Sequence, residues 1–243
     1  MMNRRFGRIA GLAAMALVAL SLAGCFLFFG KDDPGPAAPV REEPAAVDGS
    51  IPGSGCEITG FDSAEYKFTP GESGIWLIRM TVTRDSFSDL EIIDKVGGFV
   101  AKSDGRLGDY NSFIATHLWA GEAYTINAVK HTYSAGSPGD YTLSVSLAEA
   151  IPGGGGEARV DRITVFTFVP DRSGEWTFRT SENDGCDPSL VVHDLDEVFI
   201  FYDNDGAGDK NSLIAEHLEA GRLYLVNAYM GVNEEGSYTL TVE

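Results

Sequence analysis

The sequence predicts an all-β protein in which two tandem β-sandwich domains follow an export signal and a tether. Three features of the 243-residue chain lead to this prediction. Apolar and polar residues alternate with the period of a strand, turn motifs recur roughly every eight to twelve residues, and the whole pattern returns after one hundred residues.

The first 24 residues have the composition of an export signal. Three arginines within the first eight residues precede an apolar run from Ile9 to Leu22, which is short for a membrane span. The run ends in LAGC, residues 22–25, which resembles the lipobox of bacterial lipoproteins. This resemblance implies cleavage before Cys25 and acylation of that cysteine with palmitate-like chains, and hence an anchor in the envelope membrane. An ordinary signal peptide with an incidental cysteine is the alternative.

Residues 25–50 form the predicted tether, because they are rich in Pro, Ala and acidic residues and show no hydrophobic period. By resemblance to lipoprotein sorting signals, Phe26 favours the outer membrane if the host is Gram-negative. The formal net charge of the chain is -18. Such a surface repels phosphate backbones, so we expect no nucleic-acid partner.

Two long segments repeat at a constant offset of one hundred residues. IPGSGCE at 51–57 returns as IPGGGGE at 151–157, and GDYNSFIATHLWAGEAYTINA at 108–128 returns as GDKNSLIAEHLEAGRLYLVNA at 208–228. We therefore predict one domain at 51–150 and a second at 151–243, joined through the IPGGGG linker. Each copy should hold seven or eight strands and needs no helix, with Trp76 and Trp176 in the two cores.

An ordered series of short motifs resembles the bacterial pre-peptidase C-terminal domain. In the second copy the motifs are Phe166–Pro170, Ser173–Trp176, Asp187–Asp194, Asp203–Ser212, Leu218–Tyr224 and Gly236–Val242. The first copy departs from the pattern where SFSDL, residues 86–90, replaces CDPSL. The resemblance covers roughly 56–148 and 156–243. It implies a jelly-roll-like, noncatalytic sandwich of the kind that accompanies secreted proteases and sometimes binds calcium or an extracellular polymer.

The loop YDNDGAGDKNS, residues 202–212, is the candidate metal site. Calcium prefers six to eight oxygen ligands, and the loop and its neighbouring strand offer Asp203, Asp205, Asp209, Asn211, Asp187 and Asp194. The first copy has KSDGRLGDYNS at 102–112, so both copies keep only Gly-Asp-x-Asn-Ser. A turn is the simpler explanation for a motif that both copies keep. Calcium binding stays an alternative for the second copy, which alone has the additional aspartates.

A hydrolytic triad is a weaker possibility. Asp109, Ser112 and His117 recur as Asp209, Ser212 and His217, but the surrounding sequence resembles no nucleophile elbow. We expect no catalytic residue here. A hydrolase remains the alternative class, and a cleft that brought the serine and histidine together would support it.

Two cysteines remain after Cys25. In an oxidising compartment Cys56 and Cys186 could form a disulfide between the two domains, and two thiols are the equal alternative.

Aromatic residues distinguish the first copy from the second. Phe87, Tyr110, Trp119 and Tyr133 fall in predicted loops or loop edges of the first copy. They could form a platform for sugar rings or peptide, or pack against the other domain, which the sequence favours. Taken together, the sequence predicts a noncatalytic, lipid-anchored envelope protein that presents a β-sandwich surface. Its partner would be an envelope protein or an extracellular polymer, and a calcium-stabilised adhesin is the alternative.

Overall fold

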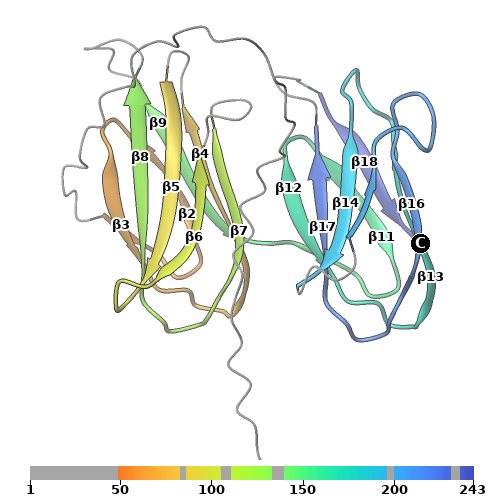
Figure 1. The fold of residues 1–243 in the computed structure, drawn as a ribbon, viewed down its shortest axis with the longest axis horizontal. Coiled ribbons are helices and arrows are strands. Elements are labelled where there is room, and N and C mark those ends of the chain that lie inside the picture. Colours follow the sequence, from red (N-terminus) through yellow and green to blue (C-terminus); the bar gives the residue numbers. More distant parts are fainter. Residues whose placement is uncertain (1–48, 83–85, 105–110, 133–139, 196–199, 231–235) are drawn as a thin grey trace, which may run out of the picture.

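A computed structural model describes residues 49–82, 86–104, 111–132, 140–195, 200–230 and 236–243, and Figure 1 shows them as two β-sandwiches side by side. These residues form strands and turns, which confirms the all-β prediction. Within these ranges there is no helix of the length and apolarity that a bilayer crossing requires. The predicted export signal, the lipidation site Cys25 and most of the tether lie outside the described residues.

The first copy is built from two sheets that face each other. The five-stranded sheet has the order β1 (Gly49–Ile51), β3 (Ala64–Phe68), β8 (Tyr124–Thr132), β5 (Ser86–Asp94) and β6 (Phe99–Asp104). The four-stranded sheet has the order β2 (Cys56–Gly60), β9 (Tyr141–Leu147), β4 (Gly74–Val82) and β7 (Ser112–Leu118).

The second copy repeats this topology strand for strand. Its five-stranded sheet has the order β10 (Ala150–Ile151), β12 (Thr164–Phe168), β17 (Tyr224–Tyr229), β14 (Ser189–Asp194) and β15 (Ile200–Asp203). Its four-stranded sheet has the order β11 (Gly156–Val160), β18 (Tyr238–Val242), β13 (Gly174–Ser181) and β16 (Leu213–Leu218).

The IPG segments differ from the prediction, because they belong to the sheets and are more than linkers. β1 runs parallel to β3, with Ile51 opposite Phe68, and β10 runs parallel to β12, with Ile151 opposite Phe168. Both isoleucines are buried in the cores, which draws the backbone onto the sheet edge. With this addition, the described part of each copy has nine strands instead of the expected seven or eight.

The core of each sandwich lies between its two sheets, around a tryptophan. Trp76 and Trp176 are 1% and 0% exposed, as predicted, and each indole meets the edge of a phenylalanine ring. The indole nitrogens donate hydrogen bonds of 3.2 Å to the Glu72 and Arg172 carbonyls. Each tryptophan therefore buries its apolar body while its single donor stays satisfied.

A third apolar cluster joins the two copies. Ile75 on β4 and Val165 and Leu225 on β12 and β17 form it, with Leu77 and Phe113 packed at its side. These side chains point away from their own cores, because their strand neighbours point inward. The outer face of the four-stranded sheet of the first copy thus packs on the outer face of the five-stranded sheet of the second.

Polar contacts fix this packing in place. The Arg79 guanidinium donates a hydrogen bond to the Ile163 carbonyl of the second copy and lies 4.7 Å from the centre of the Phe113 ring. At the crossing between the copies, the Thr167 amide of the second copy donates to the Glu149 carbonyl of the first at 2.9 Å. The interface is therefore apolar at its centre and held by directional bonds at its edge.

Candidate functional site

The acidic loop of the second copy folds into a turn that satisfies its own polar groups. The Asp203 carboxylate accepts hydrogen bonds from the Gly206 amide at 2.7 Å and the Leu213 amide at 2.8 Å. Gly208, Asp209 and Lys210 all have positive φ, at 79°, 51° and 63°. Asparagine and aspartate tolerate this left-handed backbone better than most residues, which explains an aspartate here.

Two of the six candidate calcium ligands, Asp187 and Asp194, lie too far apart to bind the same ion. Asp187 and Asp194 flank opposite ends of β14, and Asp194 faces Arg222, which forms an ion pair with it. The inclusion of Asp194 is therefore wrong, since a strand of this length separates it from the loop. Among the described residues, no three His, Cys, Asp or Glu side chains come together as a metal-binding group. Asp187 lies beside the loop, with a carboxylate oxygen 3.9 Å from Lys210 Nζ. Calcium binding through Asp203, Asp205, Asp209, Asn211 and Asp187 stays a prediction, while the hydrogen bonds of Asp203 favour the turn.

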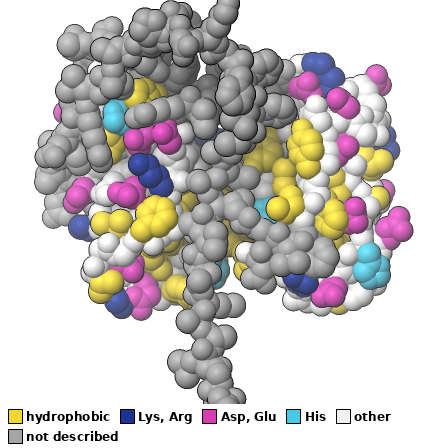
Figure 2. All heavy atoms as spheres, viewed as in Figure 1, with side chains coloured by type: hydrophobic (Ala, Val, Ile, Leu, Met, Phe, Trp, Pro, Cys, Tyr) yellow, Lys and Arg dark blue, Asp and Glu magenta, His cyan; other side chains and the backbone are white. Residues whose placement is uncertain are grey.

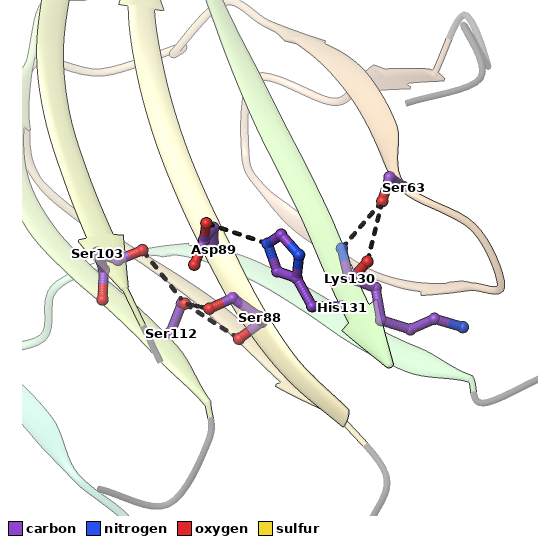
Figure 3. A network of polar contacts seen from close by, with 7 residues as sticks. All are labelled: Ser63, Ser88, Asp89, Ser103, Ser112, Lys130 and His131. Atoms are coloured by element: carbon purple, nitrogen blue, oxygen red, sulfur yellow. Dashed lines mark hydrogen bonds and ion pairs between the residues drawn. The ribbon is translucent and has the colours of Figure 1, made fainter. Parts of the chain in front are cut away.

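The repeated Asn-Ser pair ties the two sheets of each sandwich together. Ser112 is fully buried, and its hydroxyl lies 2.7 Å from the Ser88 carbonyl and 3.3 Å from the Ser103 carbonyl (Figure 3). In the second copy the Ser212 hydroxyl lies 2.8 Å from the Pro188 carbonyl, its shortest contact, and 3.0 and 3.2 Å from the Asp203 and Asn204 carbonyls. Ser112 begins β7 and Ser212 directly precedes β16, and each serine holds its strand to the neighbouring sheet, so the motif is kept for the fold.

The structure keeps the serine and histidine of the possible triad apart. Ser112 and His117 stand opposite Met80 and Ile75 along one strand, so about 16 Å of strand lies between them. Ser212 and His217 are separated in the same way along β16. Asp109 lies outside the described residues.

Cys56 and Cys186 do not form the disulfide that the sequence allows. Both are thiols, Cys56 packed against the core of the first copy and Cys186 inside the core of the second. Because each belongs to a different sandwich interior, no bond joins them.

The aromatic set divides into different environments. The prediction that Phe87 belongs to a ligand surface is wrong, since Phe87, near the start of β5, is buried and stacks on His131 with ring centres 4.4 Å apart. Tyr110 and Tyr133 lie outside the described residues. Trp119 is 53% exposed, as a ligand surface requires. The favoured interdomain packing is made by other residues, with Ile75, Val165 and Leu225 at its centre.

A partly buried pair of side chains that the sequence did not reveal lies on β5 and β8. His131 Nε2 lies 3.1 Å from a carboxylate oxygen of Asp89, with Phe87 stacked on the imidazole (Figure 3). The serine cluster around Ser112 lies nearby on the same sheet, since Ser88 precedes Asp89 on β5 (Figure 3). No local sequence pattern indicated this pair, because 42 residues separate Asp89 from His131.

Trp119 borders a surface hollow at one end of the first sandwich. The hollow has a volume of about 510 Å³ and lies between the turn after β5 and the turn after β7. Asp94, Lys95, Glu122 and Tyr124 line it with Trp119. This size falls within the range of small-molecule sites, which combine an apolar surface with a few polar groups.

Hydrogen bonds fix both walls of the hollow. In one wall, Asp94 accepts bonds from the Val96 and Gly98 amides at 2.9 and 2.7 Å. In the other, the Trp119 amide donates to the Tyr124 hydroxyl at 3.1 Å and the Gly121 amide donates to the Pro70 carbonyl at 2.9 Å. The hollow is therefore preformed.

The side chains of the hollow carry mixed charge. Lys95 Nζ lies 2.6 Å from the Glu122 carboxylate, in a pair whose side chains are 59% and 46% exposed. His117 meets the Trp119 ring edge-on, with ring centres 4.4 Å apart. Burial lowers the pKa of His117 below its ordinary value of 6.5, so the imidazole beside Trp119 is neutral at neutral pH.

Comparisons with known proteins add little to this geometry. No family model and no curated protein matches the chain. Among solved structures, the chain is similar to the CUB1-EGF-CUB2 domains of rat MASP-1, with 6% identity and a TM-score of 0.24 over 82% of this chain and 100% of that one. At this score the likeness carries no argument about function.

Proposed function

We propose that the protein is a lipid-anchored, noncatalytic cell-envelope protein whose tandem sandwich displays a ligand-binding surface outside the cytoplasm. The observation that carries the proposal is LAGC at 22–25 behind a charged and apolar leader, because this order fits an acylated Cys25. The resemblance of both copies to the pre-peptidase C-terminal domain supports a noncatalytic role.

The packing of the two sandwiches fits display at the end of a tether. An apolar cluster and the Arg79 contact hold the copies together, so ligand surfaces on either copy keep a fixed relation. Figure 2 shows Asp and Glu side chains spread over the visible face of both copies, in keeping with the net charge of -18. Such a surface stays soluble beside an anionic membrane.

Cysteine substitutions in the full-length chain test the anchor. Cells fed an alkyne analogue of palmitate should label the wild type, and the protein should sediment with membranes. The variant Cys25→Ala should lose the label and its processed mass, whereas Cys56→Ala should keep both, since Cys56 packs against a core. Equal labelling of wild type and Cys25→Ala, or recovery of both in the soluble fraction, would overturn the anchor.

A further inference from the structure

The hollow beside Trp119 has the features of a sugar site. We propose that it binds a pyranose ring of a neutral polysaccharide, with Trp119 as the stacking platform. This inference deepens the proposed function, since it names the ligand class of the displayed surface.

Trp119 supplies the apolar part of such a site. The other tryptophans, Trp76 and Trp176, are buried in the cores. Core packing therefore does not explain why Trp119 is a tryptophan, since its indole is exposed beside the hollow. The edge-on contact with His117 holds the ring in place. An aromatic ring held in one position offers a large apolar area at low entropic cost, and the apolar face of a pyranose matches it.

The polar groups around Trp119 suit hydroxyls better than a charged ligand. Asp94 and Glu122 supply acceptors and Lys95 supplies a donor, whereas sugar hydroxyls both donate and accept. A cationic ligand would meet Lys95, and an anionic ligand would meet both carboxylates and the net charge of -18. The exposed Lys95 and Glu122 pair contributes little stability, so its atoms can rearrange towards a neutral ligand.

The second copy shows the same scaffold with a different set of side chains. Its turn repeats the bonds from Glu219 N to the Tyr224 hydroxyl and from Gly221 N to the Pro170 carbonyl, at 3.1 and 2.9 Å. There Glu219 replaces Trp119, Leu195 replaces Lys95 and Arg222 replaces Glu122.

Arg222 changes the chemistry of that end. Its guanidinium pairs with Asp194, which is only 1% exposed. The equivalent Asp94 of the first copy is half-buried at the rim of the hollow. In the second copy, therefore, Arg222 pairs with the Asp194 carboxylate, and Glu219 stands where the first copy has an aromatic ring. The first copy carries the changes that a ligand site needs, on a backbone that tolerates both versions.

This comparison supplies the matched variant. Lys95→Leu with Glu122→Arg gives the first copy two residues of the second copy and keeps Trp119 as a fluorescent reporter. The fold should persist, because the second copy already carries these residues on the same turns. Glu219→Gln, in the equivalent turn of the second copy, is the control.

The test measures acrylamide quenching of tryptophan fluorescence in the full-length chain. Because Trp76 and Trp176 are buried, quenching reports on Trp119. The protein is purified from whichever fraction holds it, in a polyoxyethylene detergent, since sugar detergents would compete. The probes are cellohexaose, mannohexaose and chitohexaose, with hexalysine as the charged comparison. A sugar stacked on one indole face should lower the quenching constant by roughly half.

The expected result is protection by at least one oligosaccharide in wild type and Glu219→Gln, and its loss in Lys95→Leu/Glu122→Arg. Saturation-transfer NMR on Trp119→Glu should show the same loss without the reporter. Protection by hexalysine alone, by no probe, or equally in the double variant would overturn the proposal. This result is independent of the lipid anchor. A protein that binds sugar but is recovered in the soluble fraction would refute only the acylation of Cys25. A membrane-anchored protein that binds no sugar would refute only the sugar site.

Discussion

At the scale of single residues, a pair of buried tyrosine hydroxyls offers the cleanest test of the first core. Tyr66 and Tyr141 are both buried, and their hydroxyl oxygens lie 2.7 Å apart. Tyr66→Phe leaves the Tyr141 hydroxyl without this partner and should cost about 1–2 kcal/mol of unfolding free energy. Tyr141→Phe should cost a similar amount, measured by denaturant unfolding.

The double variant separates the hydrogen bond from packing. With both hydroxyls removed, no buried group is left unsatisfied, so Tyr66→Phe/Tyr141→Phe should cost about 1 kcal/mol less than the sum of the single variants. The second copy already has Phe166 at the position of Tyr66, and there the Tyr238 hydroxyl donates to the Tyr229 carbonyl at 3.0 Å. Strictly additive costs would show that the two hydroxyls do not interact.

Buried tyrosines also predict how stability changes in alkali. Burial raises the pKa of Tyr229 to about 12 and raises the pKa values of Tyr141 and Tyr238 still further above their ordinary 10. Above pH 10 the unfolded chain therefore releases protons that the folded protein keeps, so stability falls as pH rises. Tyrosinate absorbance should appear for these residues together with unfolding. A gradual titration of all tyrosines in the native protein would contradict this prediction.

Individual residues were the least predictable part of the molecule. Trp76, Trp176 and the exposed Trp119 followed from turn position and strand pattern. Phe87 did not, because the first copy replaces a Pro-containing loop by a strand that pairs with β8 from Ser86 to Asp94. The pairing of Asp89 with His131 depends on that strand, so no local pattern could have shown it.

At the scale of elements, the turn before β11 shows how the backbone constrains the sequence. Gly155 has φ 91°, and a Cβ there would lie 2.3 Å from the Val242 carbonyl oxygen. Gly221 has φ 75° but open space around it. Gly221→Ala should therefore cost about 1 kcal/mol from backbone strain alone.

The two glycines make a matched pair of variants. Gly155→Ala should cost at least about 2 kcal/mol more than Gly221→Ala, because β18 must shift to relieve the contact. Denaturant unfolding of both variants measures the difference directly. Equal costs would contradict this prediction, because they would mean that β18 shifts without loss of stability and that only the positive φ disfavours alanine.

Elements were largely predictable because each strand combines period-two alternation with a turn at either end. The exceptions are β1 and β10, where short IPG segments gave no alternation to detect. Their placement depends on Ile51 and Ile151 entering cores that only the complete fold creates. The acidic loop folds into a turn, as its glycines and aspartates predict, but the role of its serine depends on the neighbouring sheet.

At the scale of the whole molecule, the two copies pack head to tail, and the equivalent faces that the interface leaves unused have polar residues at central positions. The interface uses Ile75 and Leu77 from the first copy, where the second has Glu175 and Thr177. The reciprocal positions Val165 and Leu225 of the second copy are Glu65 and Thr125 in the first. A head-to-tail interface that repeats produces a filament, and the polar residues at these four positions oppose such a repeat.

This asymmetry predicts what happens when the first copy receives the residues of the second. Ile75→Glu with Leu77→Thr places a charge and a hydroxyl in the apolar cluster and should remove about 2–4 kcal/mol of interdomain stabilisation. Each core should survive, because these side chains point away from it. The wild type should tumble as one body in NMR relaxation, whereas the variant should show two faster, independent bodies and a larger radius in X-ray scattering.

Glu175→Gln with Thr177→Ser, on the equivalent free face of the second copy, is the control and should tumble like the wild type. If the interface variant still tumbles as one body, the apolar cluster does not hold the copies together, and the Arg79 bond and the bond from Thr167 to Glu149 must suffice. If it separates while the Trp119 hollow keeps its ligand, the first copy binds by itself, and the interface with the second copy is not needed for that site.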